Sequence, residues 1–143
     1  MTLHGKSFLA GALGALGGKK FQAENPATRE RLAPDFHEAS EAEVSGALQA
    51  SAAAFEVYRA RRAAEGAKLL ETTADEIEKI GDALLQRANA ETGLPLARLT
   101  GERARTCGQL RLFAQVVREG SWVDARIDPA LPDRKPLPRV DLR

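Results

Sequence analysis

The sequence predicts a mostly α-helical chain with short β-strands near its N- and C-terminal ends. Apolar residues recur at helical spacing between residues 40 and 120, short alternating segments with glycines precede them, and four prolines within ten residues follow them. Hydrophobic residues make up 43% and charged residues 29% of the 143 residues, which is typical of a globular protein. We therefore divide the chain into residues 1–39, 40–120 and 121–143.

Residues 1–39 have the pattern of strands and turns. Lys6 to Ala10 is predicted as a short strand, and Phe21 to Glu24 alternates apolar and polar side chains as a half-buried strand does. The glycine-rich run from Gly11 to Lys20 matches neither GxGxxG nor GxxxxGK[ST], so we interpret it as a flexible turn that joins two strands. Asn25 and Pro26 mark a further turn.

Residues 40–120 carry helix start and stop signals. Ser40 followed by Glu43 is a capping box, in which the serine oxygen accepts from a free amide and the glutamate reaches back. Gly81 interrupts the second helical pattern and is expected to split it, since glycine costs about 1 kcal/mol inside a helix. Gly93 and Pro95 should end this segment, and a third helix runs from about Leu96 to Gly120.

Each predicted helix has an apolar stripe. The first stripe is Val44, Ala47, Leu48, Ser51, Phe55 and Tyr58; the second is Leu70, Ala74, Ile77, Leu84, Leu85 and Ala88; the third is Leu99, Thr106, Leu110, Phe113 and Val117.

Charge is distributed unevenly between the helices. Glu41 to Tyr58 holds three acidic and no basic residues, whereas Leu96 to Glu119 holds five arginines and two glutamates. Complementary solvated faces are the preferred interpretation. A basic helix that faces an anionic ligand, with Arg103, Arg105 and Arg111 as its candidates, is the alternative.

Residues 121–143 change character, because no helix tolerates Pro129, Pro132, Pro136 and Pro138 so close together. Apolar side chains continue through this segment, at Trp122, Val123, Ile127, Leu131, Leu137, Val140 and Leu142. We expect an extended arm that lies against another surface.

Several kinds of site are excluded by residue counts. The single cysteine, Cys107, allows neither an internal disulfide nor a cysteine-cluster zinc site, and His4 and His37 have no partner at metal-ligand spacing. Cys107 falls in the middle of a predicted helix, with no base near it in the sequence, so we interpret it as a packing thiol. For the chain as a whole we predict neither a catalytic residue nor a metal site.

The partners and compartment follow from charge and hydropathy. A net charge of +1 favours neither nucleic acid nor an anionic membrane. Phe8 to Leu16 is only weakly apolar and lacks the features of a signal peptide, and no segment reaches the roughly 20 apolar residues of a membrane span. We therefore expect a cytoplasmic protein.

The segment from Glu91 to Ala114, which reads ETGLPLARL, then GERART and GQLRLFA, resembles the aldehyde dehydrogenase superfamily. Within it, the segment is most similar to α-ketoglutarate semialdehyde dehydrogenases and their NADP-preferring fatty-aldehyde relatives. The motif from Asn25 to Thr28 and the segment from Ala52 to Arg59 also resemble the family. So do Pro132 to Arg134 and Pro138 to Arg143. Arg29 departs from the glycine that the family has after the first of these motifs.

The resemblance implies that the chain is the N-terminal fragment of the α/β aldehyde dehydrogenase fold. Family members bind NAD(P) in a Rossmann-like domain, and a cysteine attacks the aldehyde while a glutamate activates water. An asparagine and a backbone amide stabilise the oxyanion. All these groups lie C-terminal to this segment in the family, so the resemblance implies that this chain alone neither binds the cofactor nor catalyses the reaction. Cys107 stands where the family has a small residue such as threonine.

The resemblance also implies supporting roles. The helices would pack beside the cofactor domain, and residues 121–143 would begin a strand arm used in homo-oligomers. The third helix borders the substrate tunnel in the family, which makes Arg105 and Gln109 candidates for approaching a substrate carboxylate. A planar guanidinium can bind both carboxylate oxygens.

Two alternatives stay open at the level of sequence. A standalone helical interaction module would use its exposed apolar arm to bind a partner. A shortened subunit would join full-length partners through the same arm. An open reading frame that continues into a glycine-rich cofactor segment favours the enzyme, and a genuine stop codon with strong expression favours the alternatives. For the isolated chain we expect marginal stability or self-association.

Overall fold

The computed structural model describes residues 3–15, 17–126 and 128–140. The elements are β1 (Phe8–Leu9), β2 (Ala12–Leu13), β3 (Lys20–Glu24), β4 (Arg31–His37), α1 (Glu41–Tyr58), α2 (Ala63–Ile80), α3 (Asp82–Thr92), α4 (Leu96–Glu119) and a 3₁₀ turn, η1 (Ser121–Val123). The sequence-based expectations for Leu16, Ile127 and Asp141 to Arg143 lie outside the described residues.

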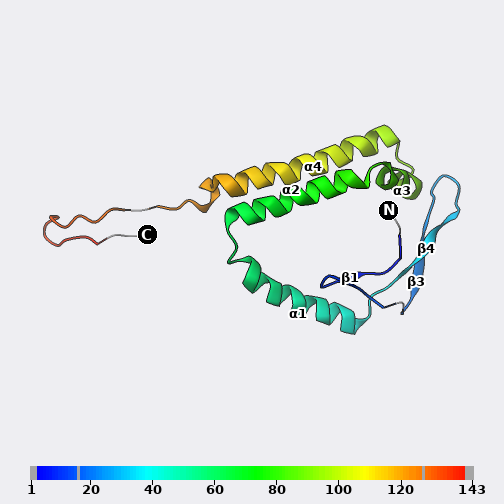
Figure 1. Ribbon diagram of the computed structural model, residues 1–143, viewed down its shortest axis with the longest axis horizontal. Coiled ribbons are helices and arrows are strands. Elements are labelled where there is room, and N and C mark those ends of the chain that lie inside the picture. The colour runs from blue at the N-terminus through cyan, green and yellow to red at the C-terminus, as the bar shows by residue number, and fades with distance from the viewer. Residues whose placement is uncertain (1–2, 16, 127, 141–143) are drawn as a thin grey trace.

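Helices dominate the fold, as predicted. Figure 1 shows α2 and α4 side by side, with α1 apart from them and the β3–β4 ribbon beside α3. Among the described residues the strands form two antiparallel pairs, β1 with β2 and β3 with β4, and no parallel sheet. The expected C-terminal strand is reduced to one isolated antiparallel bridge between Leu131 and Arg139.

The glycine-rich run builds a hairpin. Phe8 pairs with Leu13 and Leu9 with Ala12, which leaves Ala10 and Gly11 as a two-residue turn. Both turn residues have positive φ, 49° and 83°, as the hairpin turn that matches strand twist requires. The strand predicted over Lys6 to Ala10 is therefore shorter than expected, because the chain turns back at Ala10.

The β3–β4 ribbon contains a bulge that sequence patterns did not predict. Phe21 pairs with Phe36 but Ala23 pairs with Leu32, so β4 has extra residues around Pro34 at this point. A proline inside a segment argues against a strand, which is why β4 was not expected as one element. Phe21 and Phe36 stack with their ring centroids 5.6 Å apart.

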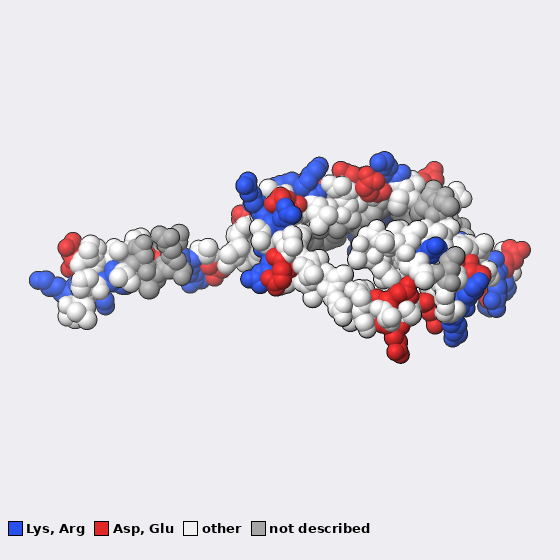
Figure 2. All heavy atoms as spheres, turned by 60° about the horizontal axis from the view of Figure 1, so that its bottom comes forward, with Lys and Arg blue, Asp and Glu red and all other residues white. Residues whose placement is uncertain are grey.

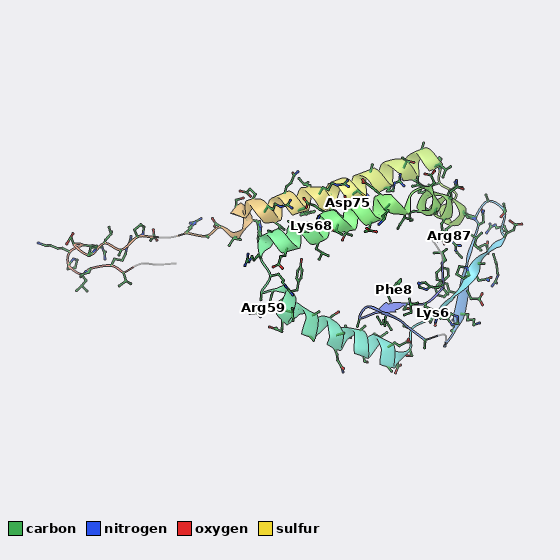
Figure 3. The ribbon with its side chains drawn as sticks, viewed as in Figure 1. Lys6, Phe8, Arg59, Lys68, Asp75 and Arg87 are labelled. Atoms are coloured by element: carbon green, nitrogen blue, oxygen red, sulfur yellow. The ribbon has the colours of Figure 1, made fainter. Side chains whose placement is uncertain are left out.

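Arg87 of α3 joins this ribbon to the helices (Figure 3). Its Nη1 donates to the carbonyl oxygen of Ala33 in the bulge. Its guanidinium also lies 6.0 Å from the ring centroid of Phe36, within the range of a cation–π contact. The bulge thus frees a carbonyl that a helix side chain can reach.

Two of the segments that resemble the family, Asn25 to Thr28 and Glu91 to Ala114, meet at the far end of the ribbon. Asn25 Oδ1 accepts hydrogen bonds from the amides of Ala27 (2.9 Å) and Thr28 (3.3 Å) and shapes the turn. Gly93, in the left-handed conformation, ends α3, and a Cβ there would lie 3.2 Å from Pro26 Cγ. Glycine is needed at this position for both reasons.

Arg29 has a φ of 64°, a left-handed conformation that glycine adopts without strain. The tight turn from Asn25, whose carbonyl accepts from the Arg29 amide at 2.8 Å, imposes this conformation on the arginine. The departure from glycine therefore leaves the turn in place.

The capping box at the start of α1 is confirmed. Ser40 Oγ accepts from the Glu43 amide at 3.2 Å, and Glu43 Oε2 accepts from the Ser40 amide at 2.8 Å. The backbone hydrogen bond from Ser40 is the main reason that the pKa of Glu43 lies below its ordinary value. The predicted apolar face of α1 is uncovered, however, since none of its residues is buried.

Gly81 separates α2 from α3, as predicted, with a φ of 68°. The predicted apolar stripe of α2 and α3 is confirmed, since all its members are buried or half-buried. The stripe of α4 was partly wrong: Thr106 and Phe113 are exposed. Cys107 and Ala114, one position further along, take the buried positions instead.

Small residues let α2 and α4 approach closely. Ala67 and Ala74 on α2, and Cys107 and Ala114 on α4, are all fully buried, and each pair is seven residues apart. The Cys107 Sγ donates to the Ala74 carbonyl oxygen at 3.6 Å, so Cys107 of α4 packs directly against Ala74 of α2. Two helices with such a repeat meet along a continuous seam.

Enlarging this seam should destabilise the protein. For Ala74→Leu we expect a loss of about 1–3 kcal/mol in the free energy of unfolding, because the added carbons have no space between α2 and α4. Urea unfolding followed by circular dichroism measures it. Ala104→Leu adds the same side chain at an exposed position of α4 and should change the free energy by less than about 0.5 kcal/mol. Equal losses in the two variants would contradict the close seam.

Candidate functional site

Arg105 and Gln109 lie on the side of α4 that faces away from α2. With about 100° of rotation per residue, each lies about 160° round the helix from Cys107, which is on the α2 side. Both residues are exposed and lie one turn apart on the helix. The face they occupy is therefore open to a ligand or to another part of a larger protein.

A neighbouring carboxylate holds the guanidinium of Arg105. Its Nε and Nη2 donate to Glu102 Oε2 at 3.0 and 2.9 Å, and the Arg105 side chain is 68% exposed. A pair this exposed contributes little to stability. A substrate carboxylate could replace Glu102, because both offer the same acceptor oxygens.

Glu102 also lines an apolar groove of about 400 Å³ between α2, α3 and α4. The groove is otherwise lined by Ile77, Ile80, Leu84, Leu85, Ala88, Leu99, Arg103 and Thr106. Through Glu102, Arg105 is linked to the rim of this groove. An acyl chain would fit such walls better than an ion would.

Cys107 is a packing thiol. It is fully buried, and its Sγ donates to the carbonyl oxygen of Ala74. The two arginines one turn away are bound elsewhere: Arg103 Nη1 donates to the Gly81 carbonyl oxygen at 3.0 Å, and Arg111 binds acidic residues of α2. The geometry offers Cys107 neither a base nor access to an aldehyde.

Two basic side chains of α4, Arg111 and Arg118, find their acidic partners on α2 and not on α1. Arg111 donates to Glu78 (2.8 Å to each oxygen) and to Asp75 (2.9 Å), and Arg118 binds both oxygens of Glu71 at 2.6 and 2.7 Å. These contacts raise the pKa of both arginines, with the Glu78 hydrogen bond the largest cause at Arg111. Of the three arginines that the sequence offered as an anion site, Arg103 and Arg111 therefore already bind acceptors within the fold.

The same contacts lower the pKa of Glu71 and Glu78 below the ordinary value of 4.5, chiefly through the hydrogen bonds from Arg118 and Arg111. Figure 2 shows basic and acidic side chains mixed over one face of the helical part, as such cross-helix pairs require. The excess of arginine on α4 therefore contributes to the pairing of α4 with α2.

The described residues contain no cluster of three or more His, Cys, Asp or Glu side chains that could hold a metal ion. Within the same residues, every helix is too short or too polar to cross a membrane.

The fold and motifs define the class of protein. A sequence profile of the aldehyde dehydrogenase family matches residues 15–134, and the chain belongs to this family. It is an N-terminal fragment of the aldehyde dehydrogenase fold, as the resemblance implied.

Two curated relatives are α-ketoglutaric semialdehyde dehydrogenases. The chain is 52% identical to the second such enzyme of Azospirillum brasilense over 99% of this chain and 26% of that protein. It is 44% identical to that of Acinetobacter baylyi over 98% of this chain and 27% of that protein. The chain therefore spans about a quarter of the length of these relatives.

A solved structure supports the fold. The NAD-dependent benzaldehyde dehydrogenase of Corynebacterium glutamicum is similar with a TM-score of 0.60 and 20% identity. The similarity covers 92% of this chain and 28% of that one. At this identity the similarity concerns the arrangement of helices and strands alone.

The cross-helix ion pairs predict a loss of stability in acid. A carboxyl group whose pKa is lowered by folding adds stability above its unfolded pKa, and this stability disappears as the pH falls through the folded pKa. We expect the melting temperature to be constant near neutral pH and to fall below pH 4.5, the ordinary pKa of Glu71 and Glu78. Melting curves between about pH 7 and pH 2 measure this.

Glu71→Gln and Glu78→Gln should lower the melting temperature at neutral pH and flatten its fall in acid. Glu76→Gln is the matched control, since Glu76 pairs with Lys79 on its own helix. An unchanged acid profile in the first two variants would contradict a role for these pairs in stability.

Proposed function

We propose that this chain is part of an NAD(P)-dependent enzyme that oxidises α-ketoglutaric semialdehyde, or a similar semialdehyde, to a carboxylate. The observation that carries the proposal is the 52% identity over 99% of the chain to an α-ketoglutaric semialdehyde dehydrogenase. The exposed face with Arg105 suits a substrate that carries a carboxylate.

The residues of this chain do not fit a dinucleotide. The glycine-rich run forms the β1–β2 hairpin, and the Gly14 amide donates to the Ser7 carbonyl oxygen at 2.8 Å across it. A phosphate-binding loop needs free amides at the start of a helix. We therefore assign binding of NAD or NADP, and the chemistry of the reaction, to parts of the enzyme outside this chain.

Apart from the proposed substrate contact at Arg105 and Gln109, the chain's contribution would be structural. α1 exposes Val44, Leu48 and Phe55, which are 50%, 68% and 58% exposed, and the arm exposes Leu137 and Val140. Apolar surface of this extent is typical of an interface. We propose that the rest of the enzyme covers α1, that residues 121–143 join subunits of a homo-oligomer, and that the enzyme is cytoplasmic.

The first experiment is aldehyde-dependent reduction of NAD and NADP by the purified 143-residue chain with α-ketoglutaric semialdehyde. We expect no turnover from this chain. A protein that continues it to the length of its relatives should give turnover with this aldehyde. If the 143-residue chain gave turnover and Cys107→Ala abolished it, Cys107 would not be a packing thiol. The same result would contradict the proposal that catalysis depends on parts of the enzyme outside this chain. An inactive full-length protein would favour an interaction module or a shortened partner subunit.

Arg105 gives a second test in the full-length enzyme. We expect Arg105→Ala to raise the KM for a dicarboxylic semialdehyde about 10- to 100-fold, the effect of losing a charge-assisted hydrogen bond. Steady-state kinetics with an uncharged aldehyde of similar length should show little change. Gln109→Ala should act in the same direction with a smaller effect. An unchanged KM for the semialdehyde in the Arg105 variant would remove this residue from the substrate site.

Arg105→Lys and Glu102→Gln refine the test. Lysine keeps the charge but loses the planar fork, so it should restore only part of the affinity. Glu102→Gln removes the carboxylate that competes for Arg105, and the KM should stay the same or fall.

A further inference from the structure

The β1–β2 hairpin lies beside α1 and is attached to the rest of the fold on both of its sides (Figure 1). Before the hairpin, the carbonyl oxygen of Gly5 accepts from the His37 amide at 2.9 Å. After it, the carbonyl oxygen of Lys19 accepts from the Glu38 amide, also at 2.9 Å. Because His37 and Glu38 are neighbours in the chain, both attachments lie at the end of β4.

Glycines in the left-handed conformation stand at both attachments. Gly5 has a φ of 65° and Gly18 a φ of 72°. Glycine adopts such conformations without strain and has more rotational freedom than any other residue. Hinges in proteins are a few loop positions of this kind that absorb the change in backbone angles. The two glycines are therefore the places about which the hairpin can move relative to β4.

Apolar packing contributes little to the contact between the hairpin and α1. Phe8 and Leu13 are 74% and 48% exposed. The ring of Phe8 meets that of His4, edge to face with the centroids 5.1 Å apart, and does not meet α1 in this way. A hollow of about 450 Å³ lies between the two elements, lined by Phe8, Leu9 and Ala10 on one side and by Ala47, Ala50 and Ala54 on the other. Side chains that face a void lose the dispersion contacts that hold packed elements together.

The carboxylate of Glu43 makes the polar contact between the two elements. Its Oε1 accepts from the Ala15 amide at 3.0 Å, and within residues 3–15 and 40–58 this is the one hydrogen bond between the two segments. Its Oε2 accepts from the amide and the hydroxyl of Ser40 at 2.8 and 3.0 Å, which fixes the side chain at the start of α1. The amides of Ser40 and then of Ala15 lower the pKa of Glu43, so both bonds favour the ionised carboxylate. Hydrogen bonds to an ionised group are the stronger kind.

Gly14 lets the carboxylate come this close to Ala15. A Cβ at position 14 would lie 2.8 Å from Glu43 Oε1, well inside van der Waals contact. The Gly14 amide is engaged within the hairpin, where it donates to the Ser7 carbonyl oxygen at 2.8 Å. A side chain at position 14 would therefore push Glu43 Oε1 away from Ala15 and leave the bonds of Oε2 to Ser40 in place.

We propose that residues 6–15 form a strap, which the Glu43 carboxylate fastens to α1 and which moves away from α1 about Gly5 and Gly18 when this contact is lost. Sparse apolar contact, one charge-assisted hydrogen bond and a glycine at each side of the hairpin together support this device. A two-stranded hairpin is only marginally stable by itself in water, so a strap that has left α1 also loses its internal hydrogen bonds. The strap is independent of the aldehyde-oxidising function.

Hydrogen exchange followed by mass spectrometry measures the state of the strap in the purified 143-residue chain. In Glu43→Ala we expect the amides of residues 6–15 to exchange at least about tenfold faster, because the bond to Ala15 is lost and the hairpin opens. Peptides from α2 and α4 should exchange as in the unaltered chain, since the variant does not touch their seam. These peptides show that the variant folds.

Two further variants separate the strap from the helix cap. Gly14→Ala retains Glu43 and Ser40 and should speed the exchange of residues 6–15 as Glu43→Ala does. Ser40→Ala removes the hydroxyl that caps α1 and should speed exchange in the first turn of α1 alone. Glu41→Ala removes a neighbouring exposed carboxylate and is the matched control, so it should leave residues 6–15 unchanged.

Three results would overturn the strap. The first is unchanged exchange of residues 6–15 in Glu43→Ala or in Gly14→Ala. The second is an equal acceleration of these residues in Glu41→Ala, which would make the effect one of charge alone. The third is an equal acceleration of every segment in Glu43→Ala, because the carboxylate would then hold the whole fold and not the hairpin.

Discussion

The close contact between α2 and α4 is the constraint on which the rest of the structure depends. Only small side chains occupy its centre, and Ala67, Ala74, Cys107 and Ala114 are all fully buried. Small side chains let the two helices approach closely, so dispersion contacts form along both of them. Side chain and backbone also meet directly, because the Cys107 thiol donates to the carbonyl oxygen of Ala74. Leu85 of α3 is the single larger apolar side chain that is buried among the described residues.

This contact explains the asymmetry of the fold. Two helices held by a narrow seam need further support, and the ion pairs of Arg111 and Arg118 with α2 supply it at the edges. The opposite face of α4, which carries Arg105 and Gln109, remains exposed. α1 has no such partner, and its main neighbour in the described structure is the short β1–β2 hairpin. α2 and α4 thus form a close pair that α3 joins, whereas α1 has no buried residue.

Local signals in the sequence predicted the ends of the elements well. Ser40 with Glu43, the split at Gly81 and the stop at Gly93 depend on backbone groups within a few residues, and all three are confirmed. The stripe on α4 was misplaced by one position, because the prediction favoured large apolar residues such as Phe113. β4 was missed for a different reason: its bulge at Pro34 breaks the alternation that identifies a strand.

The candidate site was less predictable than the fold. Arg105 and Gln109 came from a family resemblance, and their helical spacing alone places them on one exposed face. The partners of the other arginines depend on which helix packs against α4, and composition could not distinguish α2 from α1.

Glu43 connects two parts of the chain that lie far apart in the sequence. The carboxylate that caps α1 also accepts from the amide of Ala15 at 3.0 Å, 28 residues earlier in the chain. The same carboxylate that starts α1 therefore closes a loop back to the hairpin, and the entropy of that closure grows only slowly with loop length. A single side chain thus joins the start of α1 to the N-terminal hairpin region.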